Sequence, residues 1–119
     1  MRGAGKLKLI PIYIEKKYKK RIVHVEGDRE QEETLFMFAI STCIWCKRGK
    51  RWLNDRGFSY SYLDIDKIPV EEKNHIRQEL GKLIGETPSM PFLIIDDERY
   101  HSGYVPFVWE ELFNVREEG

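Results

Sequence analysis

The chain has 119 residues, with 20 Lys plus Arg against 20 Asp plus Glu, and 34% of its residues are charged. This length suits one domain with a core of its own. The balanced charge gives no reason to expect a nucleic-acid or membrane partner, and a mean hydropathy of -0.54 fits a soluble globular protein. No apolar segment of signal-peptide or membrane-spanning length follows the N-terminus, so a cytoplasmic location is expected.

The first part of the chain, residues 1–33, is predicted to be an N-terminal extension made of a β-hairpin and a linker. Isoleucine alternates with other residues over 10–14, which is typical of a strand. A basic run follows, and a solvated turn explains it better than a nucleic-acid contact. Residues 21–26 predict the second strand of the hairpin, and the acidic and polar residues 28–34 predict the linker.

The second domain, residues 34–119, opens with an apolar run at 35–40 that indicates a strand buried on both faces. Two hydroxyl residues follow, and then the only two cysteines, Cys43 and Cys46. Residues 47–56 predict a helix, and Gly57 after them is a stop signal. The two thiols therefore lie where a buried strand leads into a helix N-terminus.

That position bears on the chemistry of the thiols. The free N–H groups and the dipole of a helix N-terminus stabilise negative charge, and so favour a thiolate on Cys43. The thiolate is the reactive form, and C-x-x-C cysteines at helix starts have pKa values lowered from about 8.5 to roughly 3.5–7.5. A zinc site is the alternative, but it needs four ligands. The other candidates, His24, His75 and His101, are scattered singly, so redox chemistry is favoured.

Strand and helix patterns then alternate along the chain. β-Forming residues over 58–66 predict a second strand. Pro69 suits the first turn of a helix, which carries an apolar stripe and ends at Gly85. A loop with two prolines leads into a strand over 91–95, and a tight turn leads into a short strand over 99–102.

A last helix follows Tyr104, with Val105, Val108, Trp109 and Leu112 on one face. The order of elements is then β-α-β-α-β-β-α. The two β-α-β steps imply parallel pairing through right-handed crossovers, and the tight turn implies an antiparallel hairpin. The predicted fold is an α/β domain with a mixed four-stranded sheet and helices on both faces.

With this order, the C-x-x-C after the first strand and Met90-Pro91 at the start of the third, the chain resembles the thioredoxin fold. It looks most like the glutaredoxin-like branch, over residues 34–116. The resemblance implies that Pro91 is cis and faces the thiols, so that Met90 offers its backbone groups to an extended substrate. An X-Pro bond can adopt this form because cis costs only about 0.5–1 kcal/mol there.

Three further residues complete the predicted substrate site: Thr42, Trp45 and Gly103. Trp45 lies between the cysteines and is expected to wall the site and contact the partner; packing in the core is the alternative. The Thr42 hydroxyl either supports the thiolate or caps the helix. Gly103 follows the last strand, in the region where glutaredoxins bind glutathione.

The departures from the family bear on the electron donor. Met37 stands where thioredoxins carry a buried acid, and Ile40 stands where glutaredoxins carry a lysine for the glutathione carboxylate. The stretch Ser102-Gly103-Tyr104 replaces their Gly-Gly and acidic residue. A Ser-Gly-aromatic stretch at this position resembles that of the redoxins that serve ribonucleotide reductase and take electrons from a flavin reductase. Glutathione binding is therefore doubtful, and a thioredoxin-reductase-like donor is expected.

The sequence thus predicts a small protein-disulfide reductase. Cys43 attacks a substrate disulfide, and Cys46 resolves the mixed disulfide. The expected partners are disulfide-containing proteins, with ribonucleotide reductase as a candidate. A monomer without cofactor or metal is expected. Two alternatives stay open: an iron–sulfur carrier that shares a cluster between two chains through the first cysteine and glutathione, and an interaction module with a vestigial dithiol.

Overall fold

The apolar run after residue 34 forms the central strand of the sheet. In the computed structural model, which describes residues 13–113, this strand is β2 (Leu35–Ala39), and all five of its residues are buried. It pairs with β3 (Tyr60–Asp64) in parallel and with β4 (Phe92–Ile95) in antiparallel orientation. A strand paired on both edges and covered on both faces excludes water, as the continuous apolar pattern predicted.

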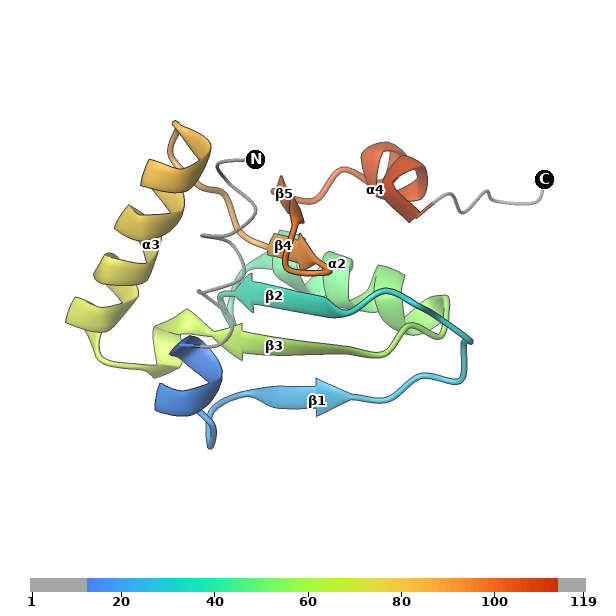
Figure 1. Ribbon diagram of the computed structural model, residues 1–119, viewed down its shortest axis with the longest axis horizontal. Helices are drawn as coiled ribbons and strands as arrows, with labels where there is room; N and C mark the ends of the chain where they lie inside the picture. The colour runs from blue at the N-terminus through green and yellow to red at the C-terminus, as the bar shows by residue number, and fades with distance from the viewer. Residues whose placement is uncertain (1–12, 114–119) are drawn as a thin grey trace.

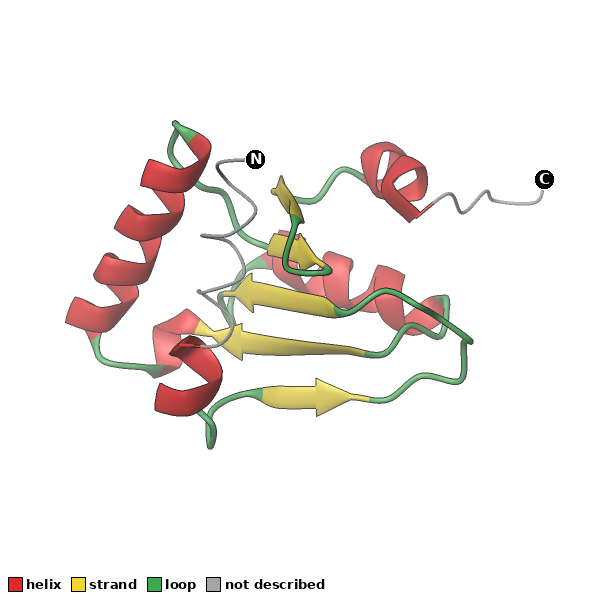
Figure 2. Cartoon of the chain, viewed as in Figure 1, coloured by secondary structure: helices red, strands yellow, loops and turns green. Residues whose placement is uncertain are grey.

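Two further strands, β1 (Val23–Val25) and β5 (Arg99–Ser102), complete a five-stranded sheet of order β1-β3-β2-β4-β5 (Figures 1 and 2). The helices are α2 (Ile44–Asp55), the 3-10 helix η1 (Ile65–Lys67), α3 (Val70–Ile84) and α4 (Pro106–Phe113), and residues 13–17 are also helical.

Helices cover both faces of this sheet. In Figure 1, α2 lies behind the sheet, and the helical segment 13–17 lies in front of it. Trp52 of α2 contacts two rings of α4, those of Trp109 and Phe113, with ring centroids 5.5 and 5.7 Å apart. On the other side, the Tyr18 hydroxyl donates to the Glu72 carboxylate and so ties the N-terminal segment to α3. The predicted mixed sheet with helices on both faces is confirmed.

The prediction of an N-terminal hairpin is corrected by the structure. Its second strand exists as β1, but β1 pairs antiparallel with β3, which makes the sheet five-stranded rather than four-stranded. Residues 13–17 of the expected first strand and basic turn are helical, while residues 10–12 lie outside the described residues. The physical reason is that Ile14 and Tyr18 lie four residues apart and are both buried, which is a helical spacing.

The second β-α-β step also differs from the prediction. β4 runs antiparallel to β2, whereas the two β-α-β steps were expected to give parallel pairing. Figure 1 shows α3 running across the ends of the strands rather than back along the sheet. The chain therefore re-enters the sheet from the end where β3 left it, and β4 takes the opposite direction. The predicted hairpin between β4 and β5 is confirmed, with Asp96 and Asp97 at φ 56° and 57° in its turn.

Candidate active site

The turn between β2 and α2 presents the two thiols, and a contact with η1 holds this turn. The backbone N–H of Ser41 donates to Asp66 Oδ1 at 2.9 Å, and the Ser41 hydroxyl donates to Oδ2 at 2.5 Å. Burial raises the pKa of Asp66, but these hydrogen bonds outweigh it, so the pKa falls below its ordinary value. The carboxylate is therefore ionised at neutral pH and fixes the turn that precedes the first cysteine.

Cys43 itself caps α2. Its backbone is extended (φ -82°, ψ 123°), and its Sγ accepts a hydrogen bond from the Cys46 N–H at 3.3 Å. The half-buried sulfur thus accepts a hydrogen bond from a helix N–H group that has no partner within the helix. The suggestion that Thr42 caps the helix is wrong: Thr42 is exposed and precedes the cap.

Cys46 lies one turn further along α2 and is fully buried. Its Sγ accepts a hydrogen bond from the Ile40 N–H at 3.4 Å. The pKa of Cys46 is raised to about 12, mainly by burial and to a smaller extent by the hydrogen bond with Cys43. The Ile40 N–H and the Lys50 ammonium lower this pKa. Cys46 is therefore a neutral thiol at rest, and Cys43 is the sulfur that another molecule can reach.

The loop before β4 meets the thiols. The Met90–Pro91 bond is cis, as predicted, and the Met90 carbonyl oxygen lies 3.9 Å from Cys43 Sγ. Gly103 adopts φ 93° and donates its N–H to the Pro91 carbonyl oxygen at 2.9 Å. Met90 therefore contacts Cys43 directly, while Gly103 joins the site through Pro91.

Trp45 lies on the surface beside Cys43. It is 51% exposed, and the Arg48 guanidinium lies 5.0 Å from the centre of its ring. This exposure excludes the alternative in which Trp45 packs in the core. Ile44 next to it is 54% exposed, so an apolar surface borders the accessible thiol. Exposed aromatic and aliphatic side chains at such a position suit contact with another protein.

One feature near the site was missed by the sequence reasoning. Lys50 Nζ forms an ion pair with Asp64 Oδ1 at 3.2 Å, with only 18% and 11% of the two side chains exposed. The same ammonium lies 3.8 Å from the centre of the Tyr62 ring. The available signal was that Lys50 follows Cys46 by four residues and so shares its side of the helix. Its partners on β3 required the tertiary structure.

Two of the histidines weighed as zinc ligands, His101 and His24, have other contacts, and His75 is exposed. Nδ1 of His101 lies 3.1 Å from Trp109 Nε1 and 2.7 Å from the Gly103 carbonyl oxygen, so this ring links β5 to α4. His24 Nδ1 lies 2.5 Å from Ser61 Oγ, between neighbouring strands. Within residues 13–113, no group of three His, Cys, Asp or Glu side chains is placed to hold a metal ion.

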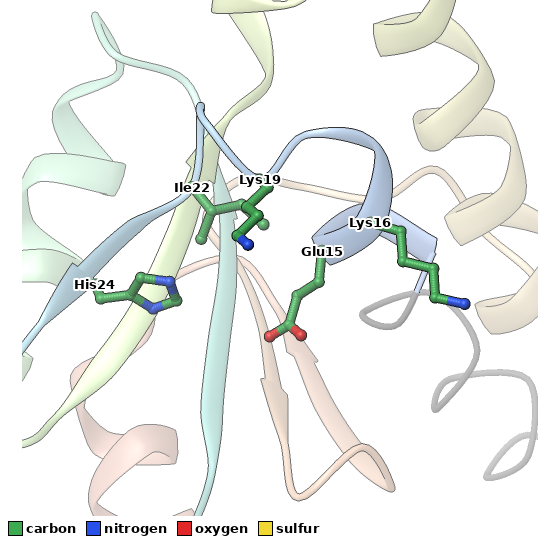
Figure 3. A pocket seen from close by; sticks show the side chains of 5 residues that line it. All are labelled: Glu15, Lys16, Lys19, Ile22 and His24. Atoms are coloured by element: carbon green, nitrogen blue, oxygen red, sulfur yellow. The ribbon is translucent and has the colours of Figure 1, made fainter.

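A hollow of about 360 Å³ lies elsewhere, between the helical segment 13–17 and β1 (Figure 3). Its lining is Glu15, Lys16, Lys19, Ile22 and His24. Both signs of charge line it, and none of the predicted site residues contributes. Lys16 and Lys19 of the basic run are exposed here, although Lys16 lies in a helix rather than in the expected solvated turn.

The buried thiol gives a prediction for alkaline pH. Burial raises the pKa of Cys46 from 9.0 to about 12, and burial likewise raises that of Tyr60 from 10.0 to about 12. The unfolded chain loses these protons first, so the free energy of unfolding of the reduced protein should fall as pH rises from about 9 to about 12. Cys46→Ser removes one of the two groups and should fall less steeply. Urea unfolding at several pH values measures both slopes, and equal slopes would contradict this assignment.

Comparisons with a protein-family model and with solved structures both found matches to this chain. The family model described as Glutaredoxin matches residues 34–100. The chain is similar to a solved glutaredoxin from Methanosarcina mazei Go1, with 29% identity and a TM-score of 0.64 over 78% of this chain and 87% of that one. It is also similar to the methanoredoxin of Methanosarcina acetivorans, with 27% identity and a TM-score of 0.55 over 67% and 83%.

A third similar structure is the glutaredoxin (grx-1) from Archaeoglobus fulgidus, with 27% identity and a TM-score of 0.57 over 72% of this chain and 97% of that one. No curated protein matches the chain. Among residues 13–113, no helix has the length and apolar character needed to cross a membrane.

Proposed function

The chain belongs to the glutaredoxin family and has the predicted thioredoxin fold, and we propose that it reduces protein disulfides through Cys43 and Cys46. Membership of this family makes it a thiol-redox protein. The proposed reduction of protein disulfides rests on the pair of sulfurs at the start of α2. One sulfur is half-buried and receives a helix N–H, and the other is buried one turn away.

The first chemical step uses the accessible sulfur. The Cys43 thiolate attacks one sulfur of a substrate disulfide, a Cys43–substrate disulfide forms, and the second substrate sulfur departs and takes up a proton. The hydrogen bond from the Cys46 N–H stabilises the attacking charge before this step. In the second step the Cys46 sulfur attacks Cys43 Sγ and releases the remaining substrate thiol. The substrate gains two electrons, and the chain is left with a Cys43–Cys46 disulfide.

The surface around Cys43 supports a protein as the substrate. Trp45 and the neighbouring Ile44 offer exposed apolar area, and the Met90 carbonyl faces the sulfur as an acceptor for an extended chain. Thr42 lies exposed at the edge of this surface, and Gly103 supports it through Pro91. Ribonucleotide reductase is one substrate of this kind that we propose. We propose a cytoplasmic location, because free dithiols of this type persist in reducing compartments. We also propose that the protein acts as a monomer.

The same region guides a proposal for the electron donor. Glutathione carries two carboxylates, which need charged or N–H donors. Ile40 supplies no charge, and the N–H of Gly103 already donates to the Pro91 carbonyl. A protein donor that docks on the apolar surface at Trp45 needs neither group. We therefore propose that a flavin enzyme of the thioredoxin-reductase type reduces the Cys43–Cys46 disulfide.

The predicted result is rapid reduction of the oxidised chain by a flavin thioredoxin reductase and slow reduction by glutathione. Each missing charge-assisted contact costs roughly 1.5–3 kcal/mol, which is about tenfold to a hundredfold in affinity. The measurement is turnover of a protein disulfide such as insulin by the chain with each donor system. Each donor without the chain gives the background rate.

Fast turnover with glutathione and glutathione reductase, and none with flavin thioredoxin reductases, would refute the donor proposal. Absence of turnover with every donor and with chemical dithiols would refute the reductase itself.

A further inference from the structure

Lys50, on the helix that carries the two thiols, forms a partly buried ion pair with Asp64. Lys50 follows Cys46 by one helical turn, and its ammonium reaches across to Asp64 Oδ1 at the end of β3. The Tyr62 ring lies 3.8 Å from the same ammonium. Lysine is rarely kept from water in this way, and the contacts hold its flexible side chain in one place.

The second step of the proposed reaction is favoured by such a charge. Cys46 is buried and protonated at rest, yet it must attack Cys43 Sγ as a thiolate. Burial and the hydrogen bond with Cys43 raise the pKa of Cys46, and the Lys50 ammonium is the cation that opposes them. Asp64 and Tyr62 of β3 contact the Lys50 ammonium. The Tyr60 hydroxyl donates to the Lys50 carbonyl oxygen at 3.5 Å, and Cys43 is hydrogen-bonded to Cys46.

We propose that Lys50, fixed by Asp64, is the positioning residue that speeds resolution of the mixed disulfide by stabilising negative charge on Cys46. This inference rests on the proposed reductase function and concerns only its second step. Cys46 gives up its proton to the solvent, and its sulfur forms the bond to Cys43 Sγ. The bond between Cys43 and the substrate breaks, and the departing substrate sulfur takes up a proton. Lys50 stays protonated throughout, so it supplies charge and not a proton.

A chromogenic aromatic disulfide separates the two steps in one stopped-flow experiment. Attack by Cys43 releases the first coloured thiolate at a rate that depends on reagent concentration. Resolution by Cys46 releases the second thiolate at a rate that does not. In Lys50→Met the second phase should slow about three- to tenfold near neutral pH, and its pH profile should move up by about one unit. The first phase should stay within about twofold of wild type.

Matched variants test the charge itself. Lys50→Arg keeps a cation and should restore most of the second phase. Arg51→Met removes an exposed cation, 83% accessible, from the next position of the same helix and should leave both phases unchanged. Lys50→Met combined with Asp64→Asn removes both charges, so no unpaired carboxylate destabilises the fold. The second phase should remain slow in this double variant.

Asp64→Asn alone distinguishes the proposal from general-base catalysis. It leaves the Lys50 charge unneutralised, and the Asn oxygen can still accept a hydrogen bond from the ammonium and hold it in place. The second phase should therefore stay as fast as wild type or move to lower pH. Slowing equal to that of Lys50→Met would instead identify Asp64 as a proton acceptor and overturn the proposal. A normal second phase in Lys50→Met would overturn it as well, whereas a wild-type chain without either phase would refute the reductase function.

Discussion

Cys43→Ser is expected to abolish disulfide reduction, whereas Cys46→Ser should attack a substrate disulfide once and remain attached to it. Cys43 is the half-buried sulfur at the helix cap, and Cys46 is fully buried one turn away. A serine hydroxyl at position 43 is far too weak an acid to replace the thiolate nucleophile. A serine at position 46 leaves the first step intact but removes the group that releases the substrate.

The effect should be large, because neither hydroxyl forms a disulfide under these conditions. Steady-state reduction of a protein disulfide should fall to background in both variants. Mass spectrometry without reductant should find a covalent substrate adduct on Cys43 only in Cys46→Ser. An adduct on Cys46 in Cys43→Ser, with none in Cys46→Ser, would show that the two roles are reversed.

Trp109→Ala is expected to cause the largest loss of stability among single changes near the site. Trp109 is fully buried, and its ring centroid lies 5.5 Å from that of Trp52 and 4.9 Å from that of Tyr104. Its Nε1 donates to His101 at 3.1 Å. Trp109 and Pro91 both pack closely against Gly49 of α2, where an added Cβ would lie only 3.1 Å from the Trp109 ring and 3.2 Å from Pro91. Truncation of Trp109 removes this packing and opens a cavity behind the Pro91 loop.

Losses of about 3–5 kcal/mol are usual for a buried tryptophan replaced by alanine. Urea unfolding at neutral pH measures the loss for Trp109→Ala. Phe107→Ala is the matched control: it removes an aromatic side chain from the same helix, but Phe107 is 70% exposed and its loss should stay within about 0.5 kcal/mol. Equal, small losses in the two variants would show that Trp109 does not anchor α4 to the sheet.

Local patterns predicted the part of the chain that carries the thiols. The run of β2 is apolar without interruption, and a strand buried on both faces is what such a run favours. The helix after Cys43 and the loop at Pro91 also follow from residues close together in sequence. Gly85 takes φ 76° at the end of α3, where the sequence placed a helix stop. These features depend on neighbouring residues and need no knowledge of the fold.

The features that were missed depend on contacts between distant segments. Alternating isoleucines suggested a strand near residue 14, but burial of Ile14 and Tyr18 against the sheet favours a helix. β1 pairs with β3, which is far along the chain. The direction of β4 depends on the path of α3, and the partner of Lys50 lies on another element. Periodicity within a segment contains none of this information.

A single turnover of the reduced chain, without any donor, tests the proposed two-electron reduction by Cys43 and Cys46. The measurement is a joint count of free substrate thiols and of the chain's own thiols after mixing with excess protein disulfide. Each chain should reduce one disulfide, lose both thiols and contain an internal Cys43–Cys46 bond in a non-reducing peptide map. A chain that keeps both thiols, or that forms only an adduct on one cysteine and never the internal bond, would contradict the proposed reduction.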